Sequence, residues 1–136
     1  GFTATAGGLT ITAGGLTLVE GRFTELLTVV DDNTQNMTLA VADIVAGINV
    51  HTTTSSGGAV TTDTGGNIIA GIPLTANNQC FISYYINDGN QTATFGAGDG
   101  NITIADAGNT VLAAEAAVLL WRRVTSTTVV LYIVTS

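Results

Sequence analysis

A seven-residue repeat over the first 28 residues constrains the fold more than any other feature of the chain. Three successive units begin with Gly7, Gly14 and Gly21, and a shorter unit precedes them. Each unit opens with glycine and carries β-branched residues in alternation, which is typical of a short strand and a turn and not of a coiled-coil helix. The sequence therefore predicts a repetitive β structure for residues 1–28.

One apolar side chain per unit recurs in register, namely Phe2, Leu9, Leu16 and Phe23. A single thread of such strands has no second layer to cover these side chains. Three copies of the chain wound around a common axis would bury them and hydrogen-bond strand to strand. We therefore expect residues 1–28 to form the stalk of a homotrimer, with these four residues as the contacts at its axis.

Residues 29–136 are predicted to form an all-β head. The chain has 17 Gly and one Pro, is rich in Thr and Asn, and has only 10% charged residues. This composition excludes disorder and favours strands joined by tight turns. We expect an antiparallel β-sandwich of jelly-roll-like form with one or two short helices. With so few charges, a solitary head would expose much apolar surface, which favours association.

Two segments of the head carry helix signals. Residues 38–47 are predicted to form a helix that Thr38 caps and Gly47 ends, and residues 67–72 a second helical turn. Residues 113–117 contain helix-forming residues, but we interpret them as a turn that enters a strand.

The remaining patterns predict strands and hairpins. A strand is expected over residues 48–53. Strands 81–86 and 91–95 flank an Asn-Asp-Gly-Asn turn and are predicted to form a hairpin. Strands 118–124 and 128–134 are predicted to form the last hairpin.

The charge balance limits the partners of the chain. The formal net charge is −7, and Arg22, Arg122 and Arg123 are its only cationic side chains apart from one histidine. Nucleic acid and anionic membrane surfaces are therefore poor partners. We expect the scarce arginines Arg122 and Arg123 to pair with carboxylates across the sheet or across a subunit boundary. The longest apolar stretch, residues 111–121, is too short to insert across a bilayer and contains Glu115.

Two motifs resemble catalytic or ligand-binding signatures. Asp63-Thr64-Gly65 matches the aspartic peptidase motif, which needs a second copy and would predict acid proteolysis abolished by Asp63→Asn. No apolar strand leads into Asp63, so we interpret the motif as a polar loop. Residues 96–100 could suggest a phosphate loop or a calcium repeat, but no Lys and no stacked copies accompany them. A tight turn is the simpler interpretation.

The remaining candidates favour structural roles. His51 lacks partners at metal-ligand spacing, although three copies could meet at an axis, so we predict no metal site and a bond to a hydroxyl or carbonyl. Trp121 and the tyrosines suggest either a sugar-stacking platform or, as we favour, core packing. Cys80 is expected to be a buried small hydrophobe. No cofactor and no catalytic residue is predicted, which favours a protein that is not an enzyme.

The order of segments in the head resembles a known family. Residues 37–47, 67–73, 80–87, 92–104 and 120–132 are similar to the carboxy-terminal head domain of fibre and decoration proteins of tailed phages and large DNA viruses. This resemblance implies a trimeric head that caps a repetitive stalk. It implies a structural virion protein on the particle surface, in contact with other virion proteins.

An alternative function is the receptor-binding tip of a viral tail fibre. In that case exposed polar loops would engage a host surface glycan or protein. The candidate recognition residues are Ser55, Ser56, Asp88, Asn90, Asp99 and Asn101.

Overall fold

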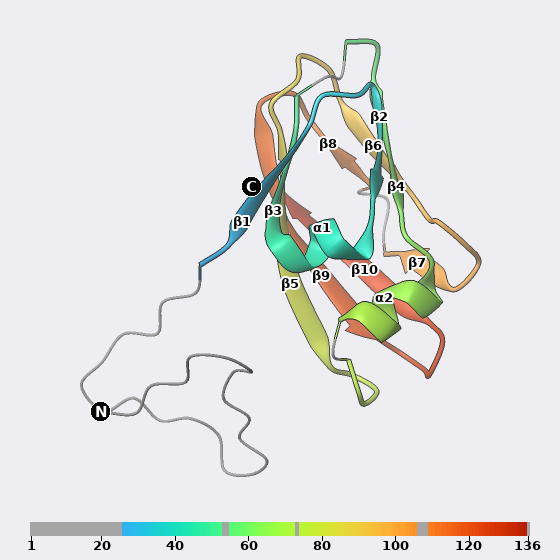
Figure 1. The fold of residues 1–136 in the computed structure, drawn as a ribbon. Helices are drawn as coiled ribbons and strands as arrows, with labels where there is room; N and C mark the ends of the chain where they lie inside the picture. The colour runs from blue at the N-terminus through green and yellow to red at the C-terminus, as the bar shows by residue number, and fades with distance from the viewer. Residues whose placement is uncertain (1–25, 53–54, 73, 106–108, 136) are drawn as a thin grey trace, which may run out of the picture.

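The computed structural model describes residues 26–52, 55–72, 74–105 and 109–135 (Figure 1). The described chain is mostly β with two short helices, which confirms the predicted prevalence of strands. The stalk residues Phe2, Leu9, Leu16 and Phe23 lie outside the described residues.

The strands are β1 (Thr28–Asp32), β2 (Asn36–Leu39), β3 (Gly47–His51), β4 (Gly58–Thr62), β5 (Cys80–Asn87), β6 (Ala93–Gly96), β7 (Ile102–Ile104), β8 (Thr110–Val111), β9 (Glu115–Arg123) and β10 (Val129–Thr135). The helices are α1 (Val41–Ala46) and α2 (Gly65–Gly71).

The strands form two sheets that face each other across one core (Figure 1). Sheet A has the order β1-β3-β5-β9-β10-β7, and sheet B has the order β2-β4-β6-β8. From β1 to β6 the chain alternates between the two sheets, so it winds as a coil of three turns. The helices α1 and α2 return the chain from sheet B to sheet A at one end, the helix end. Short loops cross at the opposite end, the turn end.

Both sheets are mixed, which corrects the expectation of an antiparallel sandwich. β1, β3 and β5 are parallel neighbours in sheet A, and β2, β4 and β6 are parallel neighbours in sheet B. This follows from the coil, because each turn runs through a sheet in the same direction as the turn before it. The antiparallel pairs come later, where β8, β9 and β10 complete the sheets.

The predicted hairpin around residues 87–90 is wrong. β5 lies in sheet A between β3 and β9, whereas β6 lies in sheet B between β4 and β8. The Asn-Asp-Gly-Asn segment is therefore a turn from one sheet to the other. Local turn residues indicate a reversal of the chain but cannot specify which strands pair across it.

The last hairpin is confirmed. β9 and β10 pair antiparallel from Arg123 with Val129 to Ala117 with Thr135. Residues 113–114 form a turn and β9 begins at Glu115, so the interpretation of residues 113–117 as a turn entering a strand is also confirmed.

The two helices begin at positions that differ from the prediction. Thr38 belongs to β2, and α1 begins after Ala40, whose N–H donates to Asp43 Oδ2 at 3.2 Å. Gly47 ends α1 as predicted, with φ +105°, a conformation that L side chains rarely adopt. α2 begins at Gly65, because Thr64 caps it by accepting the Asn67 N–H at 3.3 Å.

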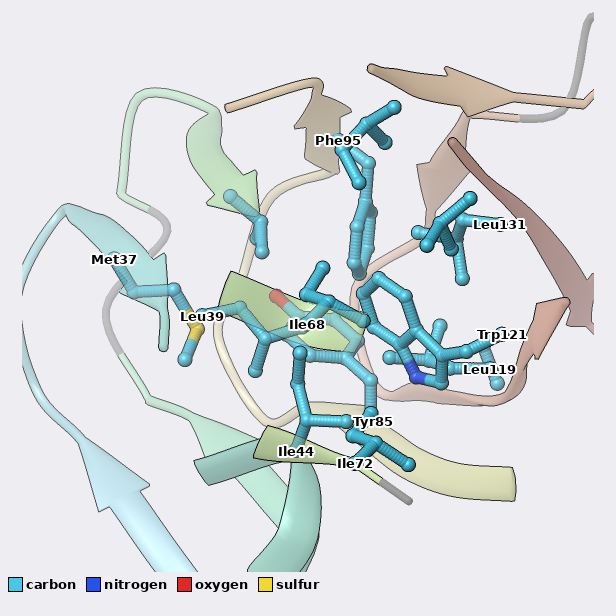
Figure 2. Close-up of a cluster of buried hydrophobic side chains, with 14 of the residues drawn as sticks. Met37, Leu39, Ile44, Ile68, Ile72, Tyr85, Phe95, Leu119, Trp121 and Leu131 are labelled. Carbon is cyan, nitrogen blue, oxygen red and sulfur yellow. The ribbon is translucent and has the colours of Figure 1, made fainter. Parts of the chain in front are cut away.

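The core lies between the sheets and is centred on aromatic side chains (Figure 2). Trp121 and Tyr85 come from sheet A and Phe95 from sheet B, and their exposure is at most 2%. Tyr85 and Phe95 meet edge to face with ring centroids 4.9 Å apart. The Trp121 indole N–H donates to Ser83 Oγ at 3.0 Å. Core packing is thus confirmed for Trp121 and Tyr85 but is wrong for Tyr84, which is 41% exposed on the outer side of β5.

A glycine contact where two turns of the coil meet tests this architecture. A Cβ on Gly98 would lie 2.1 Å from the Thr62 carbonyl oxygen, whereas one on Gly100 would meet nothing within 4 Å. We expect Gly98→Ala to lower the free energy of unfolding by about 1–3 kcal/mol, because the backbone must shift. Urea unfolding followed by circular dichroism measures this, with Gly100→Ala as the control. Equal stabilities would contradict the close approach.

Candidate functional surfaces

Asp63 links two turns of the coil through hydrogen bonds at the starts of both helices. Its Oδ2 accepts the Val41 N–H at 3.1 Å, at the first residue of α1. Its Oδ1 accepts from Asn67 Nδ2 at 2.7 Å and from the Thr64 N–H at 2.8 Å. The Asp-Thr-Gly motif is therefore a helix-capping device, in which a carboxylate satisfies N–H groups that a helix leaves unpaired.

Asp99 repeats this arrangement one turn later. Its Oδ1 accepts the Gly65 N–H at 3.1 Å, at the first residue of α2, and also the Asn101 N–H at 3.0 Å. Its Oδ2 accepts from Asn101 Nδ2 at 3.1 Å. The glycine-rich segment 96–100 is thus a turn, as predicted, and the contact of its carboxylate with α2 is the feature that sequence reasoning missed.

Both carboxylates are held in their charged form. Partial burial pushes the pKa of Asp63 upward, but hydrogen bonds from Asn67, Thr64 and Val41 together outweigh it and lower the pKa. The Gly65 N–H is the largest cause of the lowered pKa of Asp99. Charged carboxylates are the forms that cap a helix best.

His51 is a structural residue of the interior. It is fully buried at the end of β3, and its Nε2 lies 2.8 Å from the Thr34 carbonyl oxygen. A carbonyl can only accept, so Nε2 donates and Nδ1 accepts the Tyr85 hydroxyl, also at 2.8 Å. Burial raises the pKa of Tyr85, and the charge of Asp32 adds to this effect, so Tyr85 remains a donor. The predicted pairing of His51 with a hydroxyl or carbonyl is confirmed.

The exposure of Cys80 corrects its prediction, and the two arginines make no pair with a carboxylate across the sheet within the described residues. Cys80 is exposed at the start of β5, because its side chain points away from the core. Arg122 donates to Asn78 Oδ1, at 2.6 Å for its Nη2, and to the Tyr132 hydroxyl. Arg123 donates to the carbonyl oxygens of Thr125 and Leu74. Within the described residues both guanidinium groups thus bond to neutral oxygens and not to carboxylates.

The candidate recognition residues fall at opposite ends of the head. Ser55 and Ser56 lie in the β3–β4 loop, and Asp88 and Asn90 in the β5–β6 loop, both at the turn end (Figure 1). The two loops are joined where the Gly58 N–H donates to the Thr92 carbonyl at 3.0 Å.

Asp99 and Asn101 lie at the helix end, where their side chains bond to each other. The carboxylate of Asp99 is engaged by α2 there. The structure therefore brings four of the six candidates together and separates these two from them.

The outer face of sheet A, which points away from the core, is mostly apolar, and its other members are Asp31, Cys80, Thr103 and Arg122. Along each strand of this sheet, core residues alternate with outward-pointing ones, and exposures reach 53% for Ile82, 41% for Tyr84 and 57% for Val134. The apolar members of this outer face are Val29, Ile48, Val50, Ile82, Tyr84, Ile86, Ala116, Val118, Leu120, Val130, Tyr132 and Val134. The nearly continuous apolar runs of β5, β9 and β10 are the sequence signal for strands that are apolar on both faces.

The outer face of sheet B is different in chemistry. Its outward positions include Asn36, Thr38, Thr61 and Thr94, all exposed. The two outer faces of the head thus contrast, one polar and one apolar.

The described residues hold no cluster of three or more histidine, cysteine or acidic side chains that could bind a metal. The helices in this part of the chain have six and seven residues, too few to cross a membrane. The chain matches no model of a protein family, no curated protein and no solved structure.

The carboxylate of Asp63 predicts how stability depends on pH. Because its pKa is lowered in the folded state, its contribution is present above the unfolded pKa of about 3.9 and is lost as the pH falls through the folded value. We expect Asp63→Ala to cost about 0.5–2 kcal/mol at neutral pH, the range for a lost helix cap. Its deficit relative to the unsubstituted chain should shrink in acid.

Urea unfolding at a series of pH values measures this deficit. Asp88→Ala removes an exposed carboxylate at the turn end and is the matched control, which should leave both stability and its pH profile nearly unchanged. An Asp63→Ala deficit that stays constant down to acid pH would contradict the capping role.

Proposed function

We propose that this chain is a structural virion protein without enzymatic activity, a subunit of a homotrimeric fibre or capsid decoration protein. Residues 29–136 would form the head, and residues 1–28 the β stalk that the head caps and registers. The observation that carries the proposal is the apolar outer face of sheet A, which a single copy leaves open to water.

This face supports association for an energetic reason. Fully burying one Val, Leu or Ile side chain contributes about 1.5–3 kcal/mol, and soluble monomers rarely keep a large contiguous apolar patch. The core between the sheets is already closed, so these side chains do not contribute to it. We propose that other copies of the chain bury them.

The resemblance to viral head domains supports the location and the partners. A trimer outside the cell would sit at the virion surface, against other virion proteins, and would need neither nucleic acid nor membrane insertion. The stalk, the jelly-roll-like class of the head and the axis contacts Phe2, Leu9, Leu16 and Phe23 belong to this proposal.

The mechanism of such a protein is mechanical. Side chains buried at the axis and backbone bonds between chains would resist dissociation, while the head would hold three chains in register. Because folding and assembly are then linked, stability depends on the concentration of chains.

The proposal predicts the mass of the full chain in dilute native buffer. Multi-angle light scattering should give three times the chain mass of 13.8 kDa. Unfolding should be slow, and its midpoint should rise with protein concentration. A monomeric mass with a midpoint independent of concentration would overturn the proposal.

The receptor-binding tip stays a second candidate because Ser55, Ser56, Asp88 and Asn90 gather at the turn end. The full chain would then bind glycans on an array or host cells. The variant with alanine at all four positions should lose most of that binding while its oligomeric mass stays the same. Asn101→Ala at the helix end is the control. No binding by the unsubstituted chain, or binding unaffected by the quadruple variant, would contradict this alternative.

A further inference from the structure

We infer that the outer face of sheet A is the interface between copies of this chain, and that Tyr84 stands at the threefold axis with a neighbour on either side. This inference rests on the proposed homotrimer and adds to it the surface, the partner and the residue at the centre.

The shape of the face favours two neighbours. Two shallow hollows lie on it, one lined by Tyr84, Val118 and Val134 and the other by Leu27, Ile48 and Ile86. Tyr84 and Ala116 line both hollows and so lie between them, and Tyr84 has the larger side chain. Around a threefold axis, each subunit contacts two others through different parts of its surface. The two hollows could each receive one of these neighbours.

The charge distribution is compatible with other copies of the same chain covering the outer face of sheet A. Every copy carries a net charge of −7, so association must avoid bringing carboxylates together. Among the acidic side chains of the described residues, only Asp31 takes an outward position in sheet A, and it lies on the edge strand β1. Copies can therefore meet through β5, β9 and β10 without that repulsion.

The size of the face is in the range that association between chains uses. Its six strands, about 4.8 Å apart, hold 37 residues at about 3.3 Å each and cover roughly 590 Å² in projection, and side chains add to the accessible area. Stable interfaces bury about 800 Å² on each partner, which is of the same order.

The face is also continuous with the start of the stalk. Leu26 is 91% exposed and directly precedes Leu27, which lines one hollow and packs beside Gly47. The chain that contains the predicted axis residues therefore joins the head at this face. A trimer axis that runs through sheet A would serve the head and the stalk together.

The test uses the full chain with Tyr84→Glu, which would place three carboxylates at the axis. We expect light scattering to show a fall from the trimer mass to the monomer mass at the same protein concentration. Thr61→Glu adds the same charge to the outer face of sheet B and is the matched control, which should remain trimeric. Circular dichroism checks that both variants keep their strand content.

If Tyr84→Glu does not fold, cross-linking tests whether copies of residue 84 lie close together. In a Cys80→Ser background, Tyr84→Cys should form disulfide-linked pairs of chains on mild oxidation, because the axis brings copies of residue 84 together. Thr61→Cys in the same background should stay monomeric on a denaturing gel.

The outcomes separate the inference from the proposed function. An unsubstituted trimer that survives Tyr84→Glu and does not cross-link through residue 84 would overturn the inference and leave the homotrimer standing. A monomeric unsubstituted chain would overturn both. A mass of two chains, dissociated by Tyr84→Glu, would overturn the threefold axis.

Discussion

The contact on which the rest of the fold depends is a carboxylate placed against the start of a helix from the neighbouring turn of the coil. Asp63 binds the first N–H of α1, and Asp99 binds the first N–H of α2. Each helix is too short to be stable alone. The capping carboxylates tie neighbouring turns of the coil together at the helix end.

In the stacked coil, the inner and outer faces of each sheet have different environments. Inner residues such as Trp121 and Phe95 close one core, and the buried bonds of His51 and Ser83 satisfy its polar atoms. Outward residues of sheet A such as Ile82 and Val134 are instead exposed. The proposed assembly would bury this apolar face.

Sequence reasoning succeeded where the signal is local and failed where it depends on distant pairing. The β9–β10 hairpin and the helix end at Gly47 follow from short patterns, and both are confirmed. The hairpin expected around residues 87–90 is wrong because the partners of β5 are distant in sequence. Cys80 has apolar neighbours on both faces of its strand, so their presence could not indicate which face is buried.

The sequence by itself determined that strands dominate the described chain, that β9 and β10 pair as a hairpin and that few charged side chains are available to any partner. The tertiary structure alone decided that the strands from β1 to β6 pair in parallel within each sheet, that Asp63 caps a helix 22 residues earlier and that one sheet face remains apolar and uncovered. The physical reason is that strand pairing and capping join residues across the turns of the coil. Composition and short-range periodicity report only on each residue's immediate neighbours.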